Sequence, residues 1–274
     1  MRGIDGIIER ALEEDIHTGD VTTAAVVPQA REITGRLVAK EPLVLAGLSV
    51  AARVFALVDP AIRFTPQAAD GDRVEAGTVI AAFAGDAANL LQGERVALNL
   101  LQRMCGIASL TARYVAAVAG TTARVVDTRK TTPGLRVLEK YAVRVGGGHN
   151  HRTGLYDGIL IKENHITAAG GITEAIRRAR AAIPHTLKIE IETESVEQVQ
   201  EALAAGADII MLDNMDCPTM QHCVGLIAGR ALVEASGGVN LETIAAIAAT
   251  GVDIISVGAL THSPRAMDIS MLLD

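Results

Sequence analysis

The chain has 274 residues, of which 49% are hydrophobic and 21% are charged, and its formal net charge is −7. This size and composition give enough core for one large domain or two modest ones, which excludes a disordered protein. The acidic balance argues against a nucleic-acid surface, which needs clustered basic residues, and no apolar run approaches the ~18 residues of a membrane span.

The N-terminal part of the sequence predicts a domain of short elements. Ile4–Leu12 has the apolar spacing of an amphipathic helix, and the polar run Asp15–Thr23 is typical of a turn that caps the next element. From Ile33 to Phe83 the pattern predicts strands separated by Gly, Pro and Asp. Asn89–Val118 then predicts a long helical stretch, interrupted near Gly106, that links two domains.

Beyond this stretch the pattern changes to repeating strand–helix units. Helical segments such as Ile172–Ala182, Val196–Ala205 and Leu241–Ala249 separate candidate strands at Arg124–Asp127, Gly158–Lys162, Leu187–Glu192, Asp208–Leu212, Ala231–Ala235 and Ile254–Val257. Units of this length imply a parallel sheet, which right-handed crossovers can close into a barrel. An open doubly wound sheet is the alternative. The apolar end of the chain, from Ile269 to Leu273, is expected to dock on the first domain.

Polar side chains and glycines follow the candidate strands. In α/β barrels the functional residues lie at the carboxyl ends of the strands. Here those ends carry Asp127-Thr128-Arg129-Lys130, Lys162-Glu163-Asn164-His165, Glu192, Asp213-Asn214, Ser236-Gly237-Gly238 and Gly258. Cations therefore come first, acids next and glycines last, which is more order than polar loops require.

The glycines near the last two strands favour a phosphate site. Barrels often hold a phosphate there on backbone N–H groups, and glycine allows the close approach. Ser236-Gly237-Gly238 and Gly258 have the right positions, although tight turns without a ligand are the alternative.

Glu192 and Asp213 end neighbouring strands and suit Mg²⁺ or ribose hydroxyls. Ion pairs with a nearby Lys or Arg are the alternative. Glu190 and Glu194 share a face with Glu192, which lies nearest the strand end and is preferred for that reason.

The segment from Arg124 to Arg152 is strongly basic within an acidic protein. It holds seven basic and two acidic residues, a local charge of +5 that suits a small polyanion, with a solvated helix face as the alternative. His149 and His151 could suggest zinc, but no third ligand is evident, and Arg152 better suits a carboxylate. Lys162 could instead form a Schiff base, as in barrel aldolases.

The cysteines and the N-terminus bear on location. Cys105, Cys217 and Cys223 form no CxxC pair and are odd in number, so a disulfide framework is not expected. The N-terminus lacks an apolar core of signal-peptide length. We therefore expect a cytoplasmic protein with reduced thiols.

Several strings together resemble the quinolinate phosphoribosyltransferase family, also called carboxylating nicotinate-nucleotide pyrophosphorylases. They are Glu14-Asp15, Gly19-Asp20-Val21-Thr22-Thr23, Gly93-Glu94-Arg95-Val96-Ala97-Leu98-Asn99, residues 127–136, Glu139-Lys140-Tyr141-Ala142-Val143, residues 146–152, Leu160-Ile161-Lys162-Glu163-Asn164-His165, Leu212-Asp213-Asn214 and Ser236-Gly237-Gly238. The resemblance runs nearly end to end, and the block from Asp127 to His165 is long enough to be highly specific.

The resemblance implies an N-terminal α/β sandwich domain, residues 1–107 joined by the tail 266–274, and an open α/β barrel catalytic domain of parallel strands, residues 108–265. It also implies a homodimer or higher oligomer in which Arg95 of one subunit completes the partner's site. The implied activity converts quinolinate and phosphoribosyl pyrophosphate to nicotinate mononucleotide, pyrophosphate and carbon dioxide, with Mg²⁺ as cofactor.

The same resemblance assigns roles to individual positions. Arg129, His151, Arg152 and Lys162 match the residues that hold the quinolinate carboxylates, and Lys130 matches a position near the pyrophosphate. Glu192 and Asp213 match the ribose and magnesium acids, and Ser236, Gly237 and Gly258 fall in the phosphate-binding loops. Lys130, Glu192 and Asp213 are therefore the expected catalytic residues.

Two other functions remain open from the sequence. A sister transferase that uses nicotinate, or the related molybdenum-locus protein, would share the scaffold, although one carboxylate needs fewer cations than two. A non-catalytic sensor of sugar phosphates would keep the glycine loops but could dispense with both acids and Lys130, all of which are present.

Overall fold

The computed structural model describes residues 3–27 and 31–274, which form two compact units. The first contains the chain up to Ala112, Thr131–Gly147 and Ser263–Asp274; the second contains Arg113–Lys130 and Gly148–His262. These are units of packing, and the predicted domain limits at residues 107 and 265 stay a prediction.

An antiparallel sheet organises the first unit. Its strand order is β12-β1-β5-β3, made of β1 (Glu32–Ala39), β3 (Arg63–Pro66), β5 (Val79–Asp86) and β12 (Ile269–Leu273). The short strands β2 (Leu43–Val44) and β4 (Arg73–Val74) pair separately. The apolar tail supplies the edge strand β12, which pairs antiparallel with β1, and Gln102 Nε2 donates to the Ile269 carbonyl at 2.8 Å.

The expectation of strands throughout residues 33–83 was wrong, because α3 (Leu48–Val58) is a helix. It buries Leu48, Ala51, Val54 and Phe55 at helical spacing, a signal that the many β-branched and small residues around it obscured. The Phe55 ring packs on Phe83 of the sheet with ring centroids 5.7 Å apart. Burial of this face explains why the segment is helical.

The predicted interruption of the long helix near Gly106 was also wrong. Helix α4 runs from Ala87 to Ala117 without a break. A Cβ atom on Gly106 would lie 2.0 Å from the carbonyl oxygen of Arg265, so the glycine admits the tail backbone against the helix. Glycine here serves close packing and not a helix end.

Three shorter helices complete the first unit: α1 (Asp5–Ile16), α2 (Val21–Val26) and α5 (Arg136–Val145). The predicted cap before α2 is confirmed, because the Asp20 carboxylate accepts the backbone N–H of Thr23 at 2.9 Å. The turn is shorter than predicted, since α1 continues through Ile16 and α2 begins at Val21. Tyr141 on α5 donates its hydroxyl to Asp70 at 2.7 Å, and Asp70 also accepts the N–H groups that open α3.

Six parallel strands form the sheet of the second unit. They are β6 (Arg124–Val126), β7 (Ile159–Ile161), β8 (Ile189–Thr193), β9 (Ile209–Asp213), β10 (Leu232–Ser236) and β11 (Ile254–Ser256), in the order β6-β11-β10-β9-β8-β7. This order is cyclic, because the first strand in the chain pairs with the last. A doubly wound sheet would reverse direction in its strand order, so the open barrel is confirmed and the alternative is wrong.

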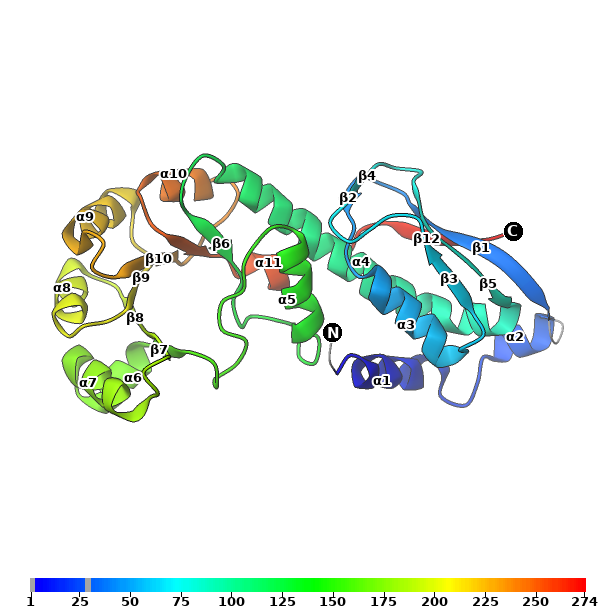
Figure 1. Cartoon of the computed structure of the whole chain (residues 1–274), viewed down its shortest axis with the longest axis horizontal. Helices are drawn as coiled ribbons and strands as arrows, with labels where there is room; N and C mark the ends of the chain where they lie inside the picture. Colours follow the sequence, from blue (N-terminus) through cyan, green and yellow to red (C-terminus); the bar gives the residue numbers. More distant parts are fainter. Residues whose placement is uncertain (1–2, 28–30) are drawn as a thin grey trace. The chain divides into compact units, whose positions relative to one another are not determined.

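Helices follow the strands and lie around the outside of this barrel (Figure 1). They are α6 (Glu163–Ala169), α7 (Ile172–Ala182), α8 (Val196–Ala204), α9 (Cys217–Ile227), α10 (Ile244–Ala249) and α11 (Ala259–His262). Ile189, Ile191 and Val233 are buried at alternate strand positions, and the residues between them, such as Glu190 and Glu234, occupy the opposite face. The helix-covered face is therefore apolar and the barrel interior is polar.

Across the described residues, 3–27 and 31–274, no helix is both long enough and apolar enough to cross a membrane.

Candidate active site

A pocket of about 720 Å³ lies at the carboxyl ends of the barrel strands. Ten of the eleven predicted site residues line it: Arg129, Lys130, His151, Arg152, Lys162, Glu192, Asp213, Ser236, Gly237 and Gly258. The eleventh, Arg95, is an exposed residue of α4 in the first unit and does not line the pocket. The structure thus brings the cations, the acids and the glycine turns of the barrel around one space.

The end of β6 is anchored by a buried carboxylate, Asp127. Its oxygens accept the side-chain amide of Asn150 at 2.5 Å and the backbone N–H of His151 at 2.9 Å. The backbone N–H of Lys130 donates to Thr128 Oγ1 at 3.0 Å, and Thr261 Oγ1 donates to the Lys130 carbonyl at 2.8 Å. These bonds fix the loop that carries the first cations of the site.

Lys162 follows β7, and its ammonium forms an ion pair with Glu192 on the neighbouring strand β8. The Lys162 side chain is 49% exposed. A Schiff-base lysine is typically activated in a desolvated pocket or beside another cation, so an exposed lysine paired with an acid favours an electrostatic role. The same ion pair is the alternative predicted for Glu192, a pairing with a nearby base.

Asp213 ends β9 and accepts the side-chain amide of Asn214 at 2.6 Å. With Glu192 it gives the pocket two carboxylates. Magnesium in transferase and kinase sites is held by one or two carboxylates together with substrate phosphates, so this pair of acids fits the ion.

The two glycine turns have different steric reasons. Gly237 has φ +91°, and a Cβ atom there would lie 2.2 Å from Asn214 Oδ1. A Cβ atom on Gly258 would lie 3.1 Å from the His262 ring and 3.2 Å from Lys130 Cδ. In both turns the backbone lies closer to a side chain of the pocket than a Cβ atom would readily allow, which explains glycine at these positions.

Arg152 is held at the edge of the pocket by its guanidinium, which donates to the Gly158 carbonyl at 3.1 Å. Burial lowers the pKa of Arg152, and the nearby charge of Arg129 lowers it further, while Glu190 and Asp157 oppose the shift. Two cations held this close and partly desolvated suit a dianionic substrate.

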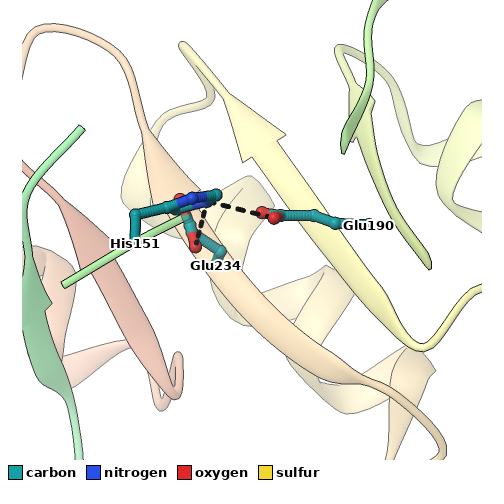
Figure 2. A group of neighbouring side chains, drawn as sticks. All are labelled: His151, Glu190 and Glu234. Carbon is teal, nitrogen blue, oxygen red and sulfur yellow. Dashed lines mark ion pairs between the residues drawn. The ribbon is translucent and has the colours of Figure 1, made fainter. Parts of the chain in front are cut away.

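His151, which is partly exposed, forms a cluster with the buried acids Glu190 and Glu234 (Figure 2). The His151 Nε2 atom is 3.0 Å from Glu190 Oε2 and 3.7 Å from Glu234 Oε2. Desolvation, followed by the charge of Glu190, raises the pKa of Glu234 to about 8. Within the described residues this is the group whose ligand atoms are near enough to hold a metal, and His149 does not belong to it.

Sequence reasoning missed two polar residues of this site, Glu234 and His262, which also line the pocket. Thr128 and Asn214, which the sequence places at strand ends without a role, line it as well. Strand alternation could have found Glu234, which lies two positions before Ser236 and shares its face. His262 follows no strand directly, and its place on α11 gave no signal.

Comparison with known proteins decides the family. The sequence profile of the quinolinate phosphoribosyl transferase C-terminal domain matches residues 107–272, and that of the N-terminal domain matches residues 20–105. The chain belongs to the quinolinate phosphoribosyltransferase family. This family member is 49% identical to the probable carboxylating nicotinate-nucleotide pyrophosphorylase of Bacillus subtilis (strain 168), over 94% of this chain and 89% of that one.

Other relatives agree along nearly the whole chain. The carboxylating nicotinate-nucleotide pyrophosphorylase of Mycobacterium leprae is 46% identical over 96% of this chain and 95% of its own length. The crystal structure of NadC from Streptococcus pyogenes superposes with a TM-score of 0.95 at 47% identity, covering 99% and 96% of the two chains. A human nicotinic acid phosphoribosyltransferase, at 13% identity and a TM-score of 0.63, shares only the fold with this quinolinate phosphoribosyltransferase family member.

Proposed function

We propose that the protein transfers a phosphoribosyl group from phosphoribosyl pyrophosphate to quinolinate and releases pyrophosphate and carbon dioxide, forming nicotinate mononucleotide for NAD biosynthesis. The observation that carries this proposal is the single pocket in which cations, two acids and two glycine turns meet. Membership of the family supplies the reaction, and the pocket supplies the groups that the reaction needs.

The cations suit the two carboxylates of quinolinate. Arg129, Arg152 and Lys162 line one pocket, and a guanidinium can hold a carboxylate through two parallel hydrogen bonds. Nicotinate has one carboxylate and would leave part of this charge unmatched. The charge count therefore favours quinolinate over nicotinate.

The glycine turns of the pocket suit the sugar phosphate. Ser236, Gly237 and Gly258 would offer a hydroxyl and backbone N–H groups to the 5′-phosphate, as late strands of barrels often do. Lys130 is placed to offset the negative charge of the leaving pyrophosphate. Magnesium, held by Glu192 and Asp213, would neutralise the pyrophosphate when bound.

Catalysis then follows from charge. Departure of pyrophosphate builds positive charge at the ribose C1, which Glu192 and Asp213 can stabilise, and preorganised electrostatics of this kind is usually the largest catalytic term. The pyridine nitrogen forms the bond to C1 as the C1–oxygen bond breaks. The bond between ring carbon C2 and its carboxylate then breaks and carbon dioxide leaves. Its electron pair stays on C2, where the cationic ring nitrogen stabilises it, and a proton from solvent binds to C2.

Arg95 and the place of the reaction complete the proposal. We propose that Arg95 acts in the pocket of a partner subunit, which requires a homodimer or a larger assembly; its exposure on α4 leaves it accessible for that role.

A cytoplasmic location is supported by Cys105, Cys217 and Cys223, which form no disulfide. Among the relatives, some are named as chloroplastic or mitochondrial.

An assay with purified protein, quinolinate, phosphoribosyl pyrophosphate and Mg²⁺ tests the function. Nicotinate mononucleotide and carbon dioxide should form in equal amounts, and nicotinate as the control substrate should give far less product. Equal or faster turnover of nicotinate would identify the sister transferase. Tight binding of phosphoribosyl pyrophosphate without any pyrophosphate release would identify a sensor.

A further inference from the structure

Two buried acids lie where the proposed mechanism gives them no task. Glu190 on β8 and Glu234 on β10 are 4% and 1% exposed, and each has one side-chain oxygen, Oε1, that is buried without a hydrogen-bond partner. Both point at the ring of His151, which lies in the segment between α5 and β7 (Figure 2). Burial of two carboxyl groups is costly, so their retention needs an explanation.

The hydrogen bonds of His151 fix the tautomer of its ring. The backbone N–H of Arg152 donates to His151 Nδ1 at 2.7 Å, so that nitrogen accepts and carries no proton. The proton of the neutral ring is then on Nε2, which lies 3.0 Å from Glu190 Oε2 and donates to it. Glu234 lies on the other side of the same nitrogen, at 3.7 Å.

This tautomer argues against a metal ion among the three side chains. A histidine that binds a metal offers a lone pair on one nitrogen and donates the N–H of the other. In His151 the nitrogen that faces the acids carries the proton, and the opposite nitrogen accepts one. The cluster is built for hydrogen bonding.

The cluster connects directly to the proposed substrate cations. His151 is held on one side by Asp127, which accepts its backbone N–H, and on the other by the ring contact to Glu190. Its ring nitrogen in turn accepts the backbone N–H of Arg152, whose side chain lines the pocket. A shift of the His151 ring would therefore move the start of the Arg152 side chain.

We propose that Glu190 and Glu234 are positioning residues for quinolinate recognition: they orient the His151 ring, and His151 in turn fixes Arg152, which binds a substrate carboxylate. This inference rests on the proposed function. His151 itself lines the pocket together with Arg152, and both of its ring nitrogens have partners within the protein.

Steady-state kinetics of Glu190→Leu and Glu190→Gln test the proposal. Leucine removes the acceptor, whereas glutamine keeps an oxygen for the His151 N–H. We expect Glu190→Leu to raise KM for quinolinate about tenfold or more, as loss of preorganisation does, while kcat and KM for phosphoribosyl pyrophosphate change less than about threefold. Glu190→Gln should restore most of the affinity, and Glu194→Leu, an exposed position after the same strand, should behave as the parent.

A double-mutant cycle separates positioning from general damage. His151→Leu should raise KM for quinolinate by a similar factor, and combining it with Glu190→Leu should add little, because both break one link. If Glu190→Leu does not fold, the contact between His151 and Glu190 can be tested from the histidine instead. KM for quinolinate is then compared between His151→Leu and His151→Gln. Additive effects, or an equal rise in KM for both substrates, would overturn the proposal. So would Zn²⁺ raising the Tm of the parent but not of Glu190→Leu.

Kinetics of the unaltered protein distinguish a failure of the proposed function from a failure of the positioning role. Absence of nicotinate mononucleotide with the unaltered protein contradicts the proposed function itself. Normal turnover of the parent together with an unchanged quinolinate KM in Glu190→Leu and His151→Leu contradicts only the positioning role.

Discussion

Lys162 and Glu192, at the ends of the neighbouring strands β7 and β8, form an ion pair within the pocket. The ion pair joins the cation expected to hold a quinolinate carboxylate to an expected catalytic acid. Binding of quinolinate would exchange one carboxylate for another on Lys162 and release Glu192 toward the ribose. Both side chains line the pocket.

Replacing Lys162 with methionine should separate catalysis from stability. The Lys162 side chain is 49% exposed, and exposed ion pairs contribute only about 0–1 kcal/mol, so the free energy of unfolding should change little. KM for quinolinate should rise about tenfold or more, since a charged hydrogen bond to substrate contributes roughly 1.5–3 kcal/mol. Urea unfolding and steady-state kinetics measure the two effects. Lys162→Arg keeps the charge, so its KM for quinolinate should lie between those of the parent and Lys162→Met. A large loss of stability in Lys162→Met with an unchanged KM would contradict this account.

Lys130→Ala and Arg152→Ala should change different kinetic parameters, kcat in the first variant and KM for quinolinate in the second. Lys130 is expected to offset charge that develops on the leaving pyrophosphate, so its loss should lower kcat by about 10²-fold or more with a small change in KM for quinolinate. Arg152 is expected to hold a carboxylate already present in the bound substrate, so its loss should chiefly raise that KM. Initial rates at varied quinolinate, with saturating phosphoribosyl pyrophosphate, distinguish the two. The reverse pattern would refute the division of roles.

The barrel could be predicted from sequence because each strand is short, contains buried aliphatic residues and is followed by a polar or glycine-rich end. Strand–helix alternation from residue 124 onward identified the six strands, and the rule that function lies at carboxyl ends identified the side chains that line the pocket. These features depend on local spacing, which a sequence carries directly.

Features that depend on contacts distant in sequence were not predictable. Gly106 resembles a helix break, and only the tail backbone packed against it shows why a glycine lies inside α4. Helix α3 is determined by burial of Phe55 on the sheet. Strand alternation could place Glu234 on the pocket face, but its proximity to His151 and Glu190 arises only when the barrel closes.

The stability of the protein should fall as pH rises from about 4.5 to about 8 because of Glu234. Its pKa is raised to about 8, first by burial and then by the charge of Glu190, while in the unfolded chain it titrates near its ordinary value of 4.5. Between these values the folded protein holds a proton that the unfolded chain has lost, so the free energy of unfolding falls with pH and levels off above 8.

Glu234→Gln, which cannot ionise, should remove this part of the pH dependence. Near pH 5 the free energies of unfolding of the variant and the parent should differ little. At pH 8.5 the variant should be more stable by up to a few kcal/mol, at about 1.4 kcal/mol for each unit of pKa difference. Urea unfolding at pH 5, 7 and 8.5 measures the slopes, with the exposed Glu194→Gln as the control. Parallel slopes in Glu234→Gln and the parent would show that Glu234 does not hold the proton.

Gly106→Ala and Gly225→Ala should change stability in opposite directions although both glycines lie in helices. A Cβ atom on Gly225 in α9 meets nothing within 4 Å, so alanine there should stabilise the protein by about 0.5–1 kcal/mol through helix propensity. At Gly106 the same atom would lie 2.0 Å from the Arg265 carbonyl oxygen, so the tail must shift, at a net cost of about 1–3 kcal/mol. Because Met267 N donates to the Gln102 carbonyl next to this contact, a displaced tail should also expose β12 to proteolysis. Urea unfolding with limited proteolysis measures both, and a Gly106→Ala protein as stable and as resistant as Gly225→Ala would show that the tail does not depend on this close approach.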